Sequence, residues 1–388
     1  MGKRIELKFK VYYFLKFIGQ GVYYPFLVML LTSKGIGGSQ LGVLLMVIPI
    51  GKVFLQPVTG YLCDLYRIHK QVLLFSLVAN ALGGMMMYFC SPVFSCYLLA
   101  IVIITLGEMN LDMLINTLAV DYLSRTNEQT EFGRWRLWGA FGFMGGSFLL
   151  GLFALDQTLP LIPIIFALAN LFAFFAALYL PDASAKKPVD WLGGIKMVTH
   201  NPPFAILLAG MVFSGISFSI IMNYYSVYME IIGAASWMIG LGVAMQTGFE
   251  ILLSANTKAI TERFSIRFVY MLGFAVVPIR SLLYFVNRNP VFGLVIQNLH
   301  GFYIFSAFIV GLLVLDLNLK PEWRSTGQSY YYAAFGGIGA IVGSFIAPMI
   351  FDQLGISILW AFTAGLAFMG YILIWLASKK LKMLRTVN

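Results

Sequence analysis

PDASAKKPVDWLGGIKMVTHNPP, residues 181–203, divides the sequence into two halves and is the most polar stretch of the chain. Apolar runs fill nearly all of the sequence on either side of it. Six precede it, at 11–31, 42–62, 72–90, 95–122, 138–155 and 162–180, and six follow it, at 205–228, 237–260, 267–285, 291–317, 328–351 and 356–376. A helix that crosses a bilayer uses about 20 mostly apolar residues. The pattern therefore predicts an all-α membrane protein with twelve transmembrane helices, in bundles 1–180 and 205–388, with a linker at 181–204.

The composition points to lipid as the solvent of this chain. Of its 388 residues, 60% are hydrophobic and only 11% are charged, and the mean hydropathy is +0.85. Such values are typical of multi-pass membrane proteins. The first apolar run reaches spanning length without a small-residue cleavage site, so it is expected to be a helix of the protein and not a removable signal. The expected location is the inner cell membrane.

The basic residues predict the orientation of the helices. Lys and Arg in short loops stay on the cytoplasmic side of a membrane. Placing the N-terminus inside leaves only Lys34 and Arg288 in outer loops, and most of the 26 Lys and Arg residues fall in cytoplasmic segments. Both termini are therefore expected to be cytoplasmic. The same dispersal accounts for the formal net charge of +10 without nucleic-acid binding, which is not expected.

No cofactor, metal ion or catalytic group is indicated by the sequence. Cys63, Cys90 and Cys96 lack metal-ligand spacing. They are expected to be ordinary residues of the helices and loops, with a disulfide between Cys90 and Cys96 across one outer loop as the alternative. The three histidines are far apart, and no zinc-protease motif or phosphate-binding loop is present. An enzyme is therefore not expected.

A loop between the second and third predicted helices carries a charged motif. It reads GYLCDLYRIHK at 60–70 and places Gly60, Asp64, Arg67 and Lys70 at a membrane boundary. A glycine lets helices approach closely, and a carboxylate beside bases can hold one face of a transporter closed. The motif resembles the loop motif of the major facilitator superfamily, which implies a gating role for these four residues. The alternative is a solvated turn.

Within that superfamily the chain resembles, over almost its full length, the branch of lactose permease, the nucleoside/proton symporters and the phenylpropionate permease. The resemblance implies transport by alternating access, and it implies that Arg136 corresponds to a sugar-binding arginine. It is carried by GQGVYYPF at 19–26, FLQPVTGYLCD at 54–64, FGRWRLWGAFGF at 132–143 and the spacing of Arg280 and His300. LINT at 114–117 resembles a nucleoside-permease stretch.

Three differences from lactose permease indicate that the mechanism of that permease does not apply to this chain. Tyr303 stands where lactose permease has its proton-carrying glutamate, and Gln297 stands where it has a lysine. Phe143 replaces the tryptophan on which that permease stacks its sugar. A galactoside is therefore not the expected substrate.

Charged residues inside apolar helices give the sharpest physical signal. Each costs roughly 2.5–3.5 kcal/mol at a helix centre, so they must pair, face water or change protonation. Glu108, Asp112 and Asn116 are spaced i, i+4, i+8 and form one polar stripe, for which Lys16 is a predicted counter-ion and Arg136 a second partner. The other candidates are Lys52, which is expected to lie shallower and snorkel, Glu250 and Arg280.

These observations predict a proton-coupled symporter of a small organic solute, such as a nucleoside, a sugar or an aromatic acid. The alternatives are a proton-coupled exporter of the same fold and, more remotely, a membrane sensor. The protein is expected to act as a monomer. The predicted proton-coupling residues are Glu108, Asp112, Glu250 and His300. The predicted substrate-binding residues are Lys16, Gln20, Tyr24, Asn116, Arg136, Phe143, Asn223, Tyr224, Gln246, Arg280, Gln297 and His300. In MNYYSVY at 222–228 the helix is expected to break, or its tyrosines to form an interfacial belt.

Overall fold

The computed structural model is all-helical over the residues that it describes, which are all except 1, 129–130, 154–157, 183–200, 321–322 and 383–388. The chain separates into two compact units. The first comprises Met1–Pro188 with Ala235–Ala244, and the second comprises Val189–Ala234 with Met245–Asn388. Most of the predicted linker, 181–204, lies outside the described residues.

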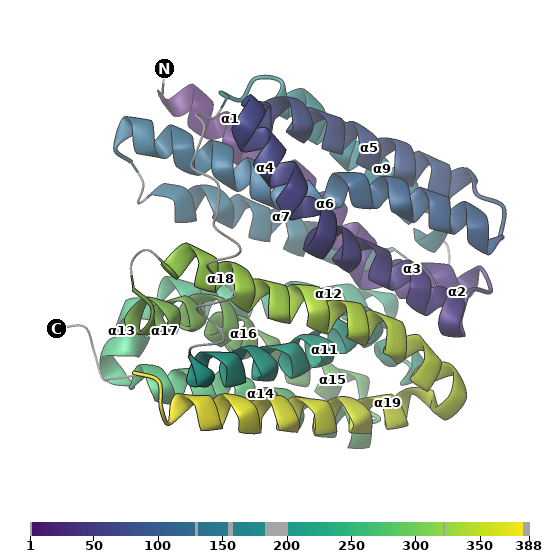
Figure 1. Ribbon diagram of the computed structural model, residues 1–388. Coiled ribbons are helices and arrows are strands. Elements are labelled where there is room, and N and C mark those ends of the chain that lie inside the picture. The colour runs from purple at the N-terminus through teal and green to yellow at the C-terminus, as the bar shows by residue number, and fades with distance from the viewer. Residues whose placement is uncertain (1, 129–130, 154–157, 183–200, 321–322, 383–388) are drawn as a thin grey trace. The chain divides into compact units, whose positions relative to one another are not determined.

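The first unit is built from long helices that correspond to the predicted apolar runs (Figure 1). Helix α1 packs against α7 and α9, and α5 packs against α6 and α9. The π-helical segment η2 separates α3 from α4 within one continuous span. The elements are α1 (Gly2–Tyr23), η1 (Tyr24–Phe26), α2 (Leu27–Ser33), α3 (Gly38–Ile50), η2 (Gly51–Leu55), α4 (Gln56–Tyr66), α5 (His69–Phe89), α6 (Phe94–Thr126), α7 (Phe132–Leu152), η4 (Leu159–Leu161) and α9 (Ile162–Ala177).

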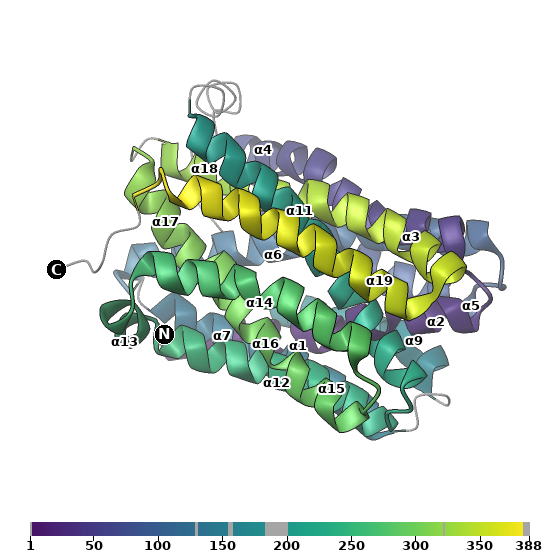
Figure 2. The ribbon, with the colours of Figure 1, turned by 90° about the horizontal axis from the view of Figure 1, so that it is seen from below.

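The second unit repeats this style of packing, with α11 beside α19 and α14 against α19 (Figure 2). Two more π-helical segments, η5 and η7, lie inside its spans. The elements are α11 (Pro202–Ile231), the part of α12 (Ser236–Ala255) that follows Ala244, α13 (Thr257–Arg263), α14 (Ile266–Val286), α15 (Pro290–Gln297), α16 (Leu299–Ile304), η5 (Phe305–Val310), α17 (Gly311–Asn318), α18 (Arg324–Tyr332), η7 (Ala333–Gly339) and α19 (Ala340–Ser378).

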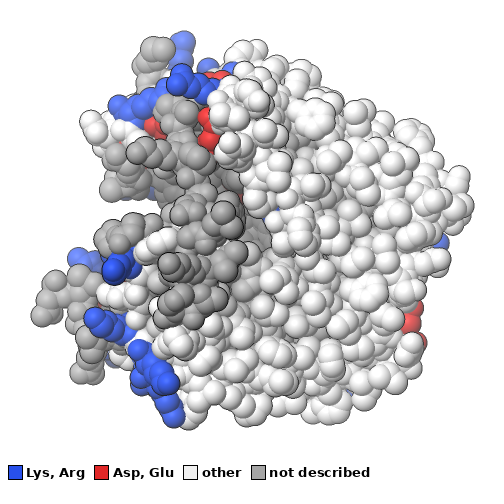
Figure 3. Space-filling view, viewed as in Figure 1, with Lys and Arg blue, Asp and Glu red and all other residues white. Residues whose placement is uncertain are grey.

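Ten helical stretches of the described residues are long and apolar enough to cross a membrane. Large apolar side chains such as Phe54, Phe89 and Leu252 are exposed, which suits a protein surrounded by lipid. In Figure 3 the visible face of each unit is largely uncharged. On this face the Lys and Arg residues of each unit gather at one end of that unit. In the first unit it is the end that holds the N-terminus, and in the second unit it is the end that holds α13. The protein is therefore a multi-pass membrane protein.

Two local features differ from the sequence-based expectations. Cys90 and Cys96 form a disulfide with an S–S distance of 2.11 Å, so the expectation that all three cysteines are unpaired is wrong. The expected break in MNYYSVY is also wrong, because these residues lie inside the continuous helix α11. Its Tyr224, Tyr225 and Tyr228 are almost completely buried and do not form an interfacial belt.

Candidate substrate and proton-coupling site

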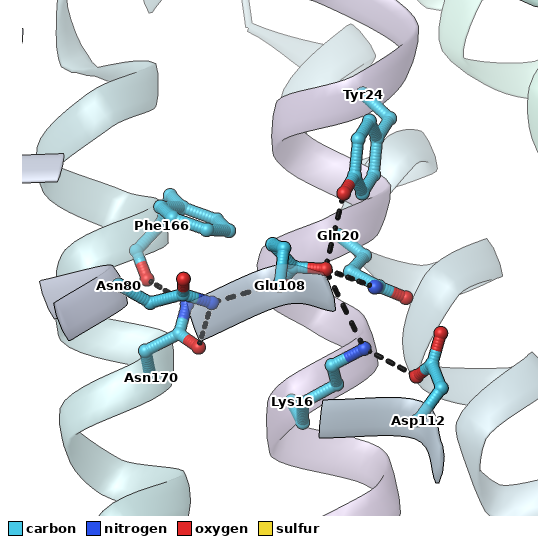
Figure 4. A network of polar contacts seen from close by, with 8 residues as sticks. All are labelled: Lys16, Gln20, Tyr24, Asn80, Glu108, Asp112, Phe166 and Asn170. Atoms are coloured by element: carbon cyan, nitrogen blue, oxygen red, sulfur yellow. Dashed lines mark hydrogen bonds and ion pairs between the residues drawn. The ribbon is translucent and has the colours of Figure 1, made fainter. Parts of the chain in front are cut away.

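A buried lysine joins two carboxylates in the first unit (Figure 4). The side chain of Lys16, on α1, has no exposed surface, and its Nζ lies 2.6 Å from Asp112 Oδ1 and 3.8 Å from Glu108 Oε2, both on α6. The predicted pairing of Lys16 with the α6 stripe is therefore present. The two carboxylates differ in access to solvent, because the Asp112 side chain is 41% exposed and the Glu108 side chain is fully buried.

Neutral donors enclose the Glu108 carboxylate. Its Oε2 accepts hydrogen bonds from Gln20 Nε2 at 2.8 Å and from the Tyr24 hydroxyl at 3.0 Å, and its Oε1 accepts one from Asn80 Nδ2 at 2.8 Å. Asn80 Nδ2 also lies 3.0 Å from Asn170 Oδ1. Donors of this kind stabilise a buried carboxylate. Sequence reasoning missed Asn80 and Asn170, although amide side chains in apolar spans are an available signal.

The third member of the α6 stripe has a different partner. Asn116 Oδ1 accepts a hydrogen bond from the Tyr13 hydroxyl at 2.8 Å. Phe143 packs at the edge of the buried core of the first unit, which includes Tyr13 and Phe17. The structure thus gathers the predicted residues of α1, α6 and α7 in one region of the first unit.

Arg136, on α7, does not form the predicted ion pair. Its guanidinium lies 4.1 Å from the centroid of the Phe17 ring and 5.8 Å from that of Tyr13, and the described residues give it no hydrogen bond or salt bridge. Gly139 makes room for it, because a Cβ there would lie 2.6 Å from an Arg136 Nη1 and 3.0 Å from Phe17 Cδ2. A guanidinium stacked on a ring keeps its N–H edge available for an acceptor.

A second polar cluster surrounds Arg280 in the other unit. This side chain is 1% exposed. It donates from Nη1 to His300 Nδ1 at 2.8 Å and from Nη2 to Gln297 Oε1 at 2.5 Å, and its Nε lies 3.3 Å from the Tyr284 hydroxyl oxygen. A His300 that accepts at Nδ1 carries its proton on Nε2. These three partners are uncharged acceptors, so they hold the cation by hydrogen bonds.

The cluster continues along the helices through Gln297. Its Oε1 also accepts from the Tyr284 hydroxyl at 2.5 Å, and its Nε2 donates to Gln246 Oε1 at 2.6 Å. Phe218 stacks against His300, with ring centroids 5.7 Å apart. Tyr284 and Phe218 were missed from the sequence, in which tyrosine and phenylalanine are too frequent to be informative.

Gln297→Met is expected to destabilise the second unit. The change leaves Arg280 Nη2 and the Tyr284 hydroxyl without their acceptor, and an orphaned buried polar group costs about 1–3 kcal/mol, more when it is charged. We expect the melting temperature of the purified protein to fall by several degrees. Asn298→Ala is the matched control, because Asn298 only caps its own helix through a bond to Leu294 O. Equal melting temperatures for the two variants would contradict this role of Gln297.

Asn223, Tyr224 and Glu250 are the other predicted residues of the second unit. Asn223 Nδ2 lies 3.4 Å from the hydroxyls of Ser219 and Ser344. Tyr224 is fully buried and packs against Phe351, with ring centroids 5.2 Å apart. Glu250 is half-buried on α12, where a Cβ on Gly301 would approach its backbone nitrogen to 2.9 Å.

Comparison with known proteins identifies the family. The model of the MFS_1 like family matches residues 6–362. The chain belongs to this family. It is 25% identical over 368 residues to the uncharacterized transporter YwbF of Bacillus subtilis (strain 168), covering 93% of this chain and 90% of that protein. It is 24% identical over 382 residues to the maltose permease of Geobacillus stearothermophilus, covering 96% and 94% of the two chains.

Solved structures of major facilitator transporters share the fold of this MFS_1 like chain. The crystal structure of the nucleoside transporter NupG superposes with a TM-score of 0.84 at 18% identity, covering 97% of this chain and 99% of that one. A bacterial homologue of the lysosomal transporter Spinster, in an inward-facing and unoccupied conformation, gives a TM-score of 0.76 at 14% identity, with coverage of 100% and 98%. The family and the fold are those of transporters.

The charged side chains in the loop motif of this MFS_1 like protein have contacts that the sequence analysis did not predict. Asp64 Oδ1 lies 3.0 Å from Nε2 of His69, which is 3% exposed, whereas Lys70 Nζ donates to Leu178 O at 2.9 Å. Arg67 adopts a left-handed conformation with φ of 57° at the end of α4. In this structure Asp64 therefore contacts His69 instead of the bases Arg67 and Lys70. The histidine was missed, although it lies within the quoted motif.

Within the described ranges, no group of three or more His, Cys, Asp or Glu side chains is placed to hold a metal ion. The chemistry that the two clusters offer is hydrogen bonding and proton exchange by carboxylate, amide, imidazole and guanidinium groups.

Proposed function

We propose that this protein is a secondary active transporter of the cell membrane that couples uptake of a small organic solute to protons by alternating access. The observation that carries the proposal is the Lys16 ammonium held between two carboxylates of different accessibility. A carboxylate that can exchange protons with water while it contacts a buried cation couples protonation to the position of that cation. Family membership and fold support transport, and the solute comes from the nucleoside, sugar and aromatic-acid classes.

We assign proton exchange to Asp112 in preference to Glu108. The Asp112 side chain is 41% exposed, and in this proposal its exposed part exchanges protons with water. Glu108 is enclosed and accepts three hydrogen bonds from neutral donors, which makes it the fixed anchor of Lys16 in this proposal. Protonation of Asp112 would release Lys16 from its 2.6 Å contact and leave it beside Glu108 alone.

Twelve spans with cytoplasmic termini complete the proposal. The stretch Thr326–Ser378 is 53 residues long and contains Gly355 with φ of 78° and ψ of 173°, which divides it into two spanning lengths. Helix α7, with 21 residues, is outside the ten stretches and carries Arg134 and Arg136 near its start. Dividing the long stretch and adding α7 makes twelve. The distribution of the basic residues in the sequence supports cytoplasmic termini.

Asp112→Asn is expected to abolish the coupling of transport to protons and to leave solute exchange intact. The amide keeps the shape of the side chain and cannot carry a proton. Purified protein in liposomes is supplied with labelled uridine, maltose or 3-phenylpropanoate, and uptake is measured with an imposed pH gradient and as counterflow without one. We expect gradient-driven accumulation to fall at least about tenfold, as loss of a general acid–base group typically produces, while counterflow continues.

Accumulation by Asp112→Asn equal to that of the unaltered protein would remove Asp112 from the mechanism. Failure of every solute to exchange in the unaltered protein would contradict the transport proposal for these three classes.

A further inference from the structure

Two lysines from neighbouring helices meet at the C-terminal end of α9, which packs against both α1 and α5. Lys8, on α1, has its Nζ 5.4 Å from the centroid of the Tyr179 ring. Lys70, on α5, donates from its Nζ to Leu178 O at 2.9 Å. Leu178 and Tyr179 directly follow Ala177, the last residue of α9. Contacts with adjacent residues therefore hold the two ammonium groups at the same end of the first unit.

The partners of both lysines are uncharged: an aromatic ring for Lys8 and a backbone carbonyl for Lys70. Both side chains are half-buried, and the described residues form no salt bridge with either of them. The salt bridges near the ends of α1, α5 and α6 join other groups, namely Glu6 with Lys10, Asp64 with His69 and Asp121 with Arg125. Two positive charges at the end of α9 are therefore not compensated by a carboxylate of the described chain.

An exposed apolar stripe runs along α9 to these lysines. Leu168, Phe172 and Phe175 are exposed and follow one another at intervals of four and three residues, so they share one face of the helix. Tyr179 comes four residues later and is 66% exposed. Tyrosine is common where a membrane protein meets the lipid headgroups. An acyl chain that lies along this stripe would place its headgroup beside Tyr179 and the two ammonium groups.

We propose that Lys8, Lys70 and Tyr179 bind the phosphate of an anionic phospholipid whose acyl chain lies along the α9 stripe. A lysine ammonium binds phosphate as a point charge, and the tyrosine hydroxyl is a further donor. Basic pockets between transmembrane helices on the cytoplasmic side bind anionic headgroups, and this end is cytoplasmic in the proposed topology. A zwitterionic headgroup carries an ammonium group of its own, which the two lysines repel. Lipid binding at this site does not require transport.

Native mass spectrometry of the detergent-purified protein, titrated with single lipids, tests the lipid class. The probes are dioleoyl phosphatidylglycerol, dioleoyl phosphatidylcholine and glycerol 3-phosphate, which has a phosphate and no acyl chain. We expect phosphatidylglycerol to bind at least about tenfold more tightly than phosphatidylcholine, because each lysine near an anionic headgroup contributes about fivefold. Equal binding of the two lipids would overturn the inference. Glycerol 3-phosphate binding as tightly as phosphatidylglycerol would indicate a site for free phosphate and would overturn the assignment to lipid.

Charge variants test the place of the site. Lys8→Gln/Lys70→Gln is expected to weaken phosphatidylglycerol binding at least about tenfold, whereas Lys8→Arg/Lys70→Arg keeps both charges and should bind within about threefold of the unaltered protein. Lys379→Gln/Lys380→Gln is the matched control, because it removes the same charge from the exposed end of α19 in the second unit; we expect a change of less than about twofold. Unchanged binding in the Lys8/Lys70 glutamine variant, an equal loss in the arginine variant, or an equal loss in the α19 variant would overturn the site.

Discussion

Lys16→Met is expected to lower the melting temperature of the purified protein by roughly 5–10 °C and to abolish transport. The Lys16 ammonium is completely buried between Asp112 and Glu108. Removing one partner of a buried ion pair costs about 3–5 kcal/mol, because the charge that remains is uncompensated. For a chain of this size each kilocalorie per mole shifts the melting temperature by about 2 °C. Thermal unfolding in detergent provides the measurement.

The double variant Lys16→Met/Glu108→Gln distinguishes a charge effect from a packing effect. An amide at position 108 removes the uncompensated buried charge, and its single oxygen can still accept from Gln20 and Tyr24, which both donate to Oε2 of Glu108. We expect it to recover at least half of the lost stability without recovering transport. A melting temperature for Lys16→Met equal to that of the unaltered protein would show that the ammonium does not hold α1 against α6.

The contact between α1 and α7 predicts a second large effect, at Gly142 and Gly146. A Cβ on Gly146 would lie 2.5 Å from Ile18 O, and one on Gly142 would collide with Phe14 O. Both obstacles are backbone atoms of α1, so the helices must move apart to admit a methyl group. Overpacking of this kind costs about 1–3 kcal/mol per site, and Gly142→Ala/Gly146→Ala is expected to lower the melting temperature by about 5–10 °C.

Gly145 offers a control within the same helix. A Cβ there meets nothing within 4 Å, so Gly145→Ala should retain stability or gain up to about 1 kcal/mol from helix propensity. Equal destabilisation by Gly145→Ala and by the double variant would show that the close contact between α1 and α7 does not explain why glycine is needed at positions 142 and 146.

The helical architecture was predictable because each span needs its own run of apolar residues and satisfies its own backbone groups. The described helices correspond to the predicted runs, including the long α6 and the span Gly38–Tyr66. The break at Gly355 also separates the last two predicted runs. Residues that extend the helices beyond the apolar runs, such as those of α1 before Val11, could not be assigned because charged residues form helices equally well outside lipid.

The site was predictable only where one helix supplies the pattern. Glu108, Asp112 and Asn116 follow helical spacing, so their shared face could be deduced from the sequence alone. Which side chains meet them depends on the rotation and crossing of other helices. For that reason Asn80 and Asn170 were missed, Asp64 was given the wrong partners, and Arg136 was paired with a carboxylate instead of Phe17. The contact between Arg280 and His300 could be predicted only from the resemblance to lactose permease.

Proton movement measured with a pH electrode tests the central claim most directly. Lightly buffered liposomes that contain the protein are given the exchanged solute on the outside, without any imposed pH gradient. The proposed coupling predicts that the external medium becomes more alkaline as protons enter with the solute, and that Asp112→Asn abolishes this change while solute still enters. Solute entry without alkalinisation in the unaltered protein, or alkalinisation that persists in Asp112→Asn, would contradict the account.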